Sequence, residues 1–137
     1  MTTPQALESV RTLIIESGRD TRYRLGAYLF ALSGLEYYIA KIGEKRHVSG
    51  RELAGGLAEF AVKQFGPLAL NVLNSWGVST TDDFGYIVYN LIDIGQMTRQ
   101  SGDRLEEFFG VLDLNEYCGS HDPFTIDREH IGALRGV

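Results

Sequence analysis

Apolar residues recur at helical spacing along most of the chain, and the clearest stripe lies between residues 80 and 95. Its members stand at positions i, i+3, i+4, i+7 and i+8, on one face of an α-helix: Phe84, Ile87, Val88, Leu91 and Ile92. Thr80 and the three residues after it open this helix, and Gly95 can adopt the left-handed backbone that ends one. We therefore expect a helix from Thr80 to Ile94.

The first part of the chain predicts two further helices. Thr3 can cap a helix that begins at Pro4 and closes at Gly18, with a buried stripe formed by Leu7, Val10, Leu13 and Ile14. A second helix, from Arg22 to Ile42, is apolar around nearly its whole circumference, which is typical of a helix packed on several sides. Its tyrosines are expected to be core residues that keep their hydroxyl groups wet.

The most specific local signal follows the loop at residues 44–47. Ser49 and Glu52 have the spacing of a capping box, in which each side chain satisfies a free backbone N–H group at the helix start. Val48 and Leu53 have the spacing of a hydrophobic staple around the same start. This pattern predicts a helix over Gly50–Phe65.

Gly66 and Pro67 stop that helix and start the next, which ends at Gly77. The apolar face of this next helix is expected to consist of Leu68, Val72, Leu73 and Trp76. After the Thr80 helix, a polar turn at residues 101–103 separates two segments near Gln96–Gln100 and Leu105–Leu112, which we interpret as the strands of a hairpin.

The expected fold is mainly α with a small C-terminal β-hairpin. We expect a single domain with an N-terminal helical pair (1–48), a winged-helix-like core (49–112) and a partly irregular tail (113–137). Within the tail, residues 113–123 are expected to form a loop and residues 127–134 a short helix.

Several short motifs between Tyr23 and Phe109 occur together in this chain. They are Tyr28-Leu29-Phe30, Arg46-His47-Val48-Ser49-Gly50, Gln64-Phe65-Gly66-Pro67-Leu68-Ala69, Trp76-Gly77 and Thr81-Asp82-Asp83-Phe84-Gly85. Over this region, about two-thirds of the chain, the sequence resembles an uncharacterised family of small bacterial proteins with no assigned activity. The resemblance therefore implies no catalytic residue. A separate and looser resemblance to winged-helix proteins covers Ser49 to Leu112.

Composition narrows the class of protein. The chain has 137 residues with 44% hydrophobic and 23% charged content, which is typical of a globular domain. Its net charge of −5 argues against a general nucleic-acid binder, since such proteins usually carry a basic surplus. The single cysteine excludes an internal disulfide. The sequence has no signal-peptide pattern and no apolar run of membrane-spanning length, so we expect a cytoplasmic protein with no membrane contact.

The positive charge is concentrated in one region. Residues 19–51 carry a net charge of +4, whereas the rest of the chain carries −9. Guanidinium groups suit bidentate binding of phosphate or carboxylate. The candidate anion-binding residues are Arg19, Arg22, Arg24, Lys45, Arg46 and Arg51. Alternatively, these side chains pair with the protein's own acids, and they flank a helix whose ends are some 30 Å apart at ~1.5 Å per residue.

Other candidate sites have simpler explanations. Cys118, His121 and His130, with the nearby acids Asp122, Asp127 and Glu129, lack the spacing of a structural zinc site. Nothing near Cys118 would lower its pKa for nucleophilic catalysis with His121 or His47. Gly55-Gly56 indicates close helix packing, and the acids Asp82 and Asp83 favour the positive end of their helix. We expect no catalytic residue, no metal and no cofactor.

The outward face of the Thr80 helix favours a protein partner. Tyr86, Tyr89, Asn90 and Asp93 lie on it together with the two acids of its first turn, and it carries no Arg or Lys. Carboxylates repel DNA phosphate, so we expect no specific binding of duplex DNA. Tyrosine is common in protein interfaces, and we expect these four residues to bind a partner or a second copy. Alternatively, Tyr86 and Tyr89 pack beneath the chain's own tail.

The function expected first is therefore a non-enzymatic protein-interaction module. An alternative is a nucleic-acid-associated or ribosome-associated regulatory factor, with RNA bound through the basic region Arg19–Arg51. A second alternative is a small enzyme of unidentified class.

Overall fold

The computed structural model describes residues 3–44 and 46–120, and every regular element in this part of the chain is a helix. In chain order the elements are α1 (Pro4–Val10), the π-helix η1 (Arg11–Glu16), α2 (Leu25–Ile42), α3 (Gly50–Phe65), the 3₁₀ turn η2 (Gly66–Leu68), α4 (Ala69–Ser75), α5 (Thr81–Asp93), the 3₁₀ turn η3 (Leu105–Phe108) and α6 (Leu114–Ser120). Within these described residues, none of the helices combines the length and apolar character that crossing a membrane requires.

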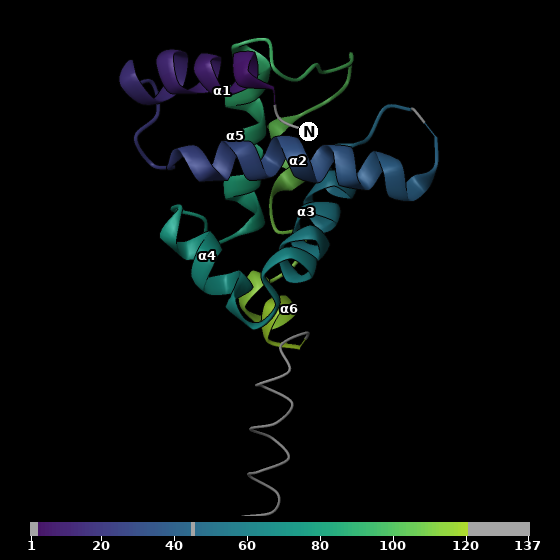
Figure 1. The fold of residues 1–137 in the computed structure, drawn as a ribbon. Coiled ribbons are helices and arrows are strands. Elements are labelled where there is room, and N and C mark those ends of the chain that lie inside the picture. The colour runs from purple at the N-terminus through teal and green to yellow at the C-terminus, as the bar shows by residue number, and fades with distance from the viewer. Residues whose placement is uncertain (1–2, 45, 121–137) are drawn as a thin grey trace, which may run out of the picture.

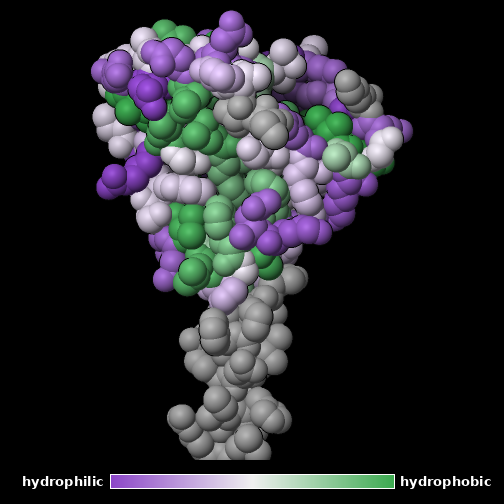
Figure 2. Space-filling view, in the orientation of Figure 1, coloured by the Kyte–Doolittle hydropathy of each residue, from purple (hydrophilic) through white to green (hydrophobic). Residues whose placement is uncertain are grey.

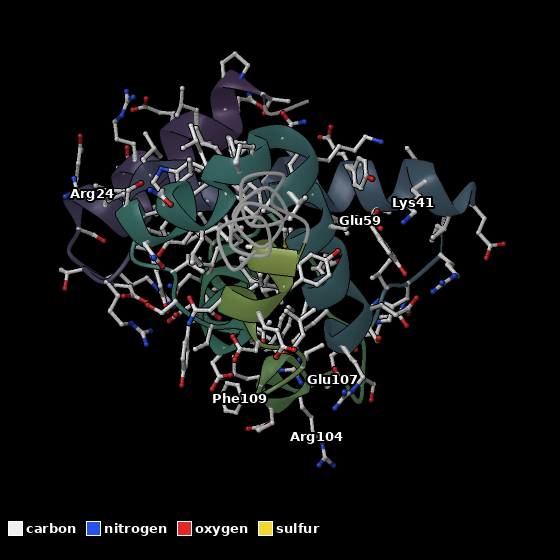
Figure 3. All side chains as sticks on the ribbon, turned by 90° about the horizontal axis from the view of Figure 1, so that it is seen from below. Arg24, Lys41, Glu59, Arg104, Glu107 and Phe109 are labelled. Atoms are coloured by element: carbon white, nitrogen blue, oxygen red, sulfur yellow. The ribbon has the colours of Figure 1, made fainter. Side chains whose placement is uncertain are left out.

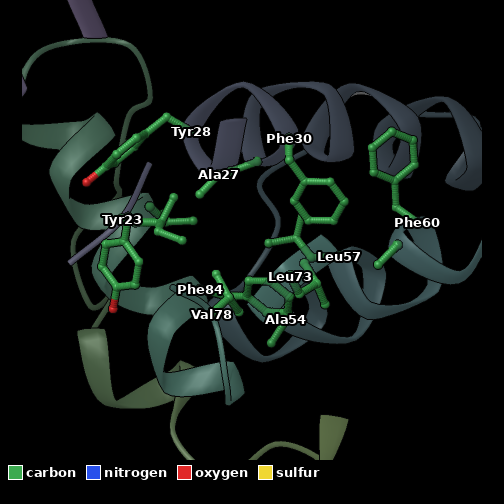
Figure 4. Packing of buried hydrophobic residues seen from close by; sticks show 14 of the residues in the cluster. Tyr23, Ala27, Tyr28, Phe30, Ala54, Leu57, Phe60, Leu73, Val78 and Phe84 are labelled. Atoms are coloured by element: carbon green, nitrogen blue, oxygen red, sulfur yellow. The ribbon is translucent and has the colours of Figure 1, made fainter. Parts of the chain in front are cut away.

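The long helix α2 lies across α5, while α3 and α4 diverge below it and α6 closes the lower end (Figure 1). The core between them is rich in aromatic rings. Phe30 of α2 lies 5.3 Å from the ring of Phe60 and 6.2 Å from that of Phe84, measured between centroids. Figure 4 shows Phe30 pointing from α2 toward Leu57 of α3, with Phe84 beyond. The exposed face shown in Figure 2 carries apolar residues in separate patches between polar ones.

The predicted starts of α3 and α5 are confirmed by their backbone hydrogen bonds. Ser49 Oγ accepts the N–H of Glu52 at 3.2 Å, and the Glu52 carboxylate accepts the N–H of Ser49 at 3.3 Å. At α5, the Asp83 carboxylate accepts the N–H groups of Ser79 and Thr80 at 2.8 and 3.1 Å. These side chains satisfy donors that the helix itself leaves free.

The predicted C-terminal β-hairpin is wrong, and with it the winged-helix-like core. Residues 96–112 are all described and contain no strand; they form a loop followed by η3. The donors that a strand would use are bound elsewhere. Gln96 and Met97 both donate to the Leu91 carbonyl, at 2.8 and 3.2 Å. Farther along, first-turn side chains of α5 bind two more: Thr81 Oγ1 accepts the N–H of Val111 at 3.2 Å, and Asp82 accepts that of Gly110 at 3.0 Å.

The first predicted helix is present, but its stripe is shifted. The chain changes from α1 to the wider π-helix at Arg11, so the buried positions recur every four residues, at Ala6, Val10 and Ile14. Leu13, which the sequence places in the stripe, is 47% exposed.

Two further expectations need correction. Leu68, which was expected on the apolar face of the helix after Gly66, is 60% exposed because it ends a 3₁₀ turn. The helix α4 begins after it and buries Ala69 and Leu73. Residues Leu114–Ser120 form the helix α6, not the predicted loop, and Leu114 and Cys118 are buried one turn apart. The predicted helix over residues 127–134 lies outside the described residues.

Candidate functional site

The predicted protein-binding face and part of the predicted anion-binding region contact each other. Arg19 forms an ion pair with Asp93 of α5, with an N–O distance of 2.6 Å. The guanidinium of Arg22 lies 4.2 Å from the ring centroid of Tyr86. Asn90 does not face outward, because its amide donates to Asp20 at 2.8 Å and to the hydroxyl of Tyr28 at 3.1 Å. These contacts fasten the joint before α2 to α5.

Asp20 is the centre of this joint. Its carboxylate accepts the backbone N–H of Arg22 at 3.0 Å and two bonds from the Arg22 guanidinium at 3.0 and 2.7 Å, besides the bond from Asn90. Burial alone would raise the pKa of Asp20, but these hydrogen bonds outweigh it and lower the pKa to about 2. The joint is therefore held by a carboxylate that stays ionised well below neutral pH.

The other predicted cations do not form one patch with this joint. Arg46 binds the Glu52 carboxylate through two bonds of 3.1 and 2.8 Å, and it also binds Glu44 at 3.2 Å. Arg24 and Arg51 are exposed and take part in no ion pair among the described residues, and Lys45 lies outside them. Arg24 and Lys41 mark opposite ends of α2 in Figure 3, so the basic residues fall into two separate groups.

The candidates for metal binding and nucleophilic catalysis are not brought together. Cys118 lies in α6 with its side chain buried, and burial raises the pKa of its thiol, which disfavours the reactive thiolate. His121, His130 and the acids near them lie outside the described residues. In the part of the chain that the structure describes, no three His, Cys, Asp or Glu side chains are grouped to hold a metal ion.

An open pocket of about 600 Å³ lies between α2, the start of α3, α5 and the loops at residues 46–49 and 96–104, and η3 forms its remaining wall. We call it the α2–α5 pocket. Its floor is apolar and includes Leu35, Ile39, Leu53, Val88, Ile92 and Met97. Its polar groups are Arg46, His47, Tyr89, Asp103 and Glu107, together with Thr98 and Gln100. A concave apolar site with a few polar groups is the usual form of a ligand-binding pocket.

One side-chain hydrogen bond joins the two loops at the rim of the α2–α5 pocket. His47 Nε2 lies 2.8 Å from Asp103 Oδ1, although 56 residues separate the two in sequence. Asp103 also organises its own loop, since its other oxygen accepts the N–H of Gln100 at 2.7 Å. Burial would raise the pKa of Asp103, but the bonds from Gln100 and His47 lower it. The rim is thus fixed by side-chain contacts where no regular element is present.

Two glycines let η3 form the remaining wall of the α2–α5 pocket. A Cβ atom at Gly50 would lie 2.8 Å from the Cβ of Glu107, and one at Gly85 would lie 2.8 Å from the Cβ of Phe108. Any side chain larger than hydrogen would therefore push η3 away from α3 and α5. The hydroxyl of Thr81, which donates to the Phe108 carbonyl at 2.7 Å, holds η3 in place.

The polar lining includes one imidazole held by a carboxylate. An imidazole held by a carboxylate, as in His47 and Asp103, can act as a general base. The lining residues in the described part of the chain include the hydroxyl groups of Thr98 and Tyr89 but no cysteine, serine or lysine. A second, shallower hollow between α2 and α3 is a weaker candidate for a binding site, since its Lys41 and Glu59 side chains form an ion pair with each other.

Sequence reasoning found only part of the α2–α5 pocket. Tyr89, a predicted partner-binding residue, lines it, with the Arg99 guanidinium 5.7 Å from its ring centroid. The predicted anion ligand Arg46 also lines it. His47 was considered only as a base for Cys118, and Asp103 and Glu107 were missed. One feature of the sequence could have indicated this site: the loops at residues 46–49 and 96–104, which carry these polar residues, lie on either side of strongly amphipathic helices.

Comparison of the chain with known protein families, with characterised proteins and with solved structures finds no match. A functional conclusion must therefore be drawn from the site itself.

Proposed function

We propose that this chain is a non-enzymatic protein-interaction module that holds an apolar side chain of its partner in the α2–α5 pocket. The observation that carries the proposal is the pocket's construction: an apolar floor inside a rim of charged and hydrogen-bonding groups. Protein interfaces place an apolar anchor at their centre and polar groups around it. Tyr89 at the rim adds an aromatic surface of the type that interfaces favour.

The charge distribution favours a protein partner over nucleic acid. Arg19, Arg22 and Arg46 are engaged by the chain's own acids, which leaves Arg24 and Arg51 as the described candidates without an acidic partner among the described residues. The net charge of −5 opposes nucleic acid further.

A selection from a random heptapeptide display library tests the proposal. Selected peptides are then measured against two variants of the folded chain. Thr98→Trp places an indole at the mouth of the α2–α5 pocket, where Thr98 is exposed. Thr21→Trp, the matched control, makes the same change at an exposed position in the joint before α2.

We expect Thr98→Trp to weaken the selected peptides at least about tenfold, since a filled anchor pocket removes the centre of the interface, whereas Thr21→Trp leaves affinity unchanged. Peptides that bind both variants as well as they bind the wild type would contradict the proposal. A selection that yields no peptide bound above the level of the unselected library would contradict it too.

A further inference from the structure

The charged residues in and beside the α2–α5 pocket differ in whether they have a partner of opposite charge or polarity within the chain. Arg46 is held by Glu52 and Glu44, and His47 is held by Asp103. Arg99 does not line the pocket but lies over the ring of Tyr89, and it donates to the backbone carbonyl of Asp103 at 2.9 Å. These groups therefore already have partners of opposite charge or polarity within the chain.

Glu107 differs from the other charged lining residues. Its carboxylate accepts the backbone N–H of Arg104 at 3.1 Å, which closes the first turn of η3. Among the described residues, no cation forms an ion pair with it. The Arg104 side chain is exposed, is absent from the pocket lining and extends away from the ribbon in Figure 3. A single bond from a backbone donor leaves most of the acceptor capacity of a carboxylate unused.

We propose that the partner segment held in the α2–α5 pocket is basic: an apolar side chain enters the pocket, and a lysine or arginine beside it pairs with Glu107. This inference rests on the proposed function and names the chemistry of the partner. The apolar floor of the pocket would bind the partner's apolar side chain. The Glu107 carboxylate on the pocket wall, which has no cation as partner among the described residues, would bind the partner's lysine or arginine. The net charge of −5 adds a long-range attraction for a basic partner.

The test uses three blocked pentapeptides that share one apolar anchor. Their central residues are Lys-Phe-Lys, Gln-Phe-Gln and Glu-Phe-Glu, each acetylated and amidated so that no terminal charge contributes. Binding to the full chain is followed by NMR titration of the backbone amides of Val88, Ile92 and Met97, which line the pocket floor. The titrations are run at low and at moderate ionic strength.

We expect the lysine peptide to bind about fivefold more tightly than the glutamine peptide at low ionic strength, and the glutamate peptide to bind least. Glu107→Gln keeps the shape of the side chain and its bond to the Arg104 N–H, so it should remove only the preference for lysine. Glu106→Gln is the matched control, because Glu106 is the adjacent exposed carboxylate and does not line the pocket. Glu107→Lys should invert the order of the three peptides.

The outcomes separate the two proposals. If all three peptides shift the floor amides equally, or if Glu107→Gln and Glu106→Gln behave alike, the basic partner is refuted while the pocket remains a binding site. If no peptide perturbs the floor amides at millimolar concentration, the proposed function fails and the inference fails with it.

Discussion

Two adjacent glycines in α3 show how sharply packing distinguishes neighbouring residues. Gly55 and Gly56 are identical in type and lie in the middle of the same helix. A Cβ atom at Gly55 would meet nothing within 4 Å, whereas one at Gly56 would lie 2.6 Å from Cδ1 of the Tyr38 ring. The sequence correctly indicated close helix packing, but only Gly56 provides it, because only Gly56 faces α2.

Substituting each glycine by alanine should therefore change stability in opposite directions. Gly55→Ala should raise the free energy of unfolding by about 0.5–1 kcal/mol, since alanine loses less backbone entropy in a helix. Gly56→Ala should lower it by about 1–3 kcal/mol, because the Tyr38 ring must move. Urea denaturation measures both values. Equal effects of the two substitutions would show that the contact between α2 and α3 is misplaced.

Asp20 should contribute stability that depends on pH. Its pKa is about 2 in the folded chain and about 3.8 in the unfolded chain, so the folded state favours the ionised form. The contribution, about 2 kcal/mol, is fully present above pH 3.8 and is lost as the pH falls toward 2. Asp20→Asn should therefore be less stable than the wild type at neutral pH and nearly equal to it at about pH 2.

Urea unfolding of the wild type and Asp20→Asn across the acid range measures this difference directly. Glu16→Gln, a change at an exposed carboxylate, is the control and should show no such trend. If the difference between wild type and Asp20→Asn stays constant from neutral pH to about pH 2, the carboxylate does not hold the joint.

At the scale of elements, local capping marks where α3 and α5 begin. Ser49→Ala removes the hydroxyl that accepts the N–H of Glu52 and should cost about 1 kcal/mol. Phe84→Ala removes a ring that is 1% exposed and should cost about 3–5 kcal/mol, because it leaves a cavity in the aromatic core. Both are measured by urea denaturation. If Ser49→Ala costs as much as Phe84→Ala, one of the two positions is misassigned.

The same reasoning explains which elements could be predicted from the sequence. α3 and α5 were predicted almost to the residue, because a capping box and an apolar stripe are local patterns. The false hairpin arose where local pattern was insufficient. Residues 105–112 contain aromatic and β-branched residues, which strands favour, but Thr81 and Asp82 of α5 bind their backbone, a tertiary contact that no local pattern reveals.

At the scale of the whole molecule, the candidate site illustrates the same limit. His47 and Asp103 form the rim only because the fold brings together two loops 56 residues apart. Conversely, Asn90 and Asp93 were expected on a free surface, yet they bind Tyr28 and Arg19. Charge and spacing identified residues that interact, but they did not distinguish interactions within the chain from interactions with a partner.

The central claim is that the α2–α5 pocket is the surface through which this protein binds its partner. The most direct measurement places a photoreactive phenylalanine analogue at Ser101, which is exposed in the loop beside the pocket but does not line it, or at Thr21, and irradiates cells that express the chain. The account predicts that position 101, beside the pocket, crosslinks one protein that position 21 does not. It also predicts that this protein, once purified, binds the wild type at least about tenfold more tightly than Thr98→Trp. The same adducts from both positions, or equal binding to Thr98→Trp, would contradict it.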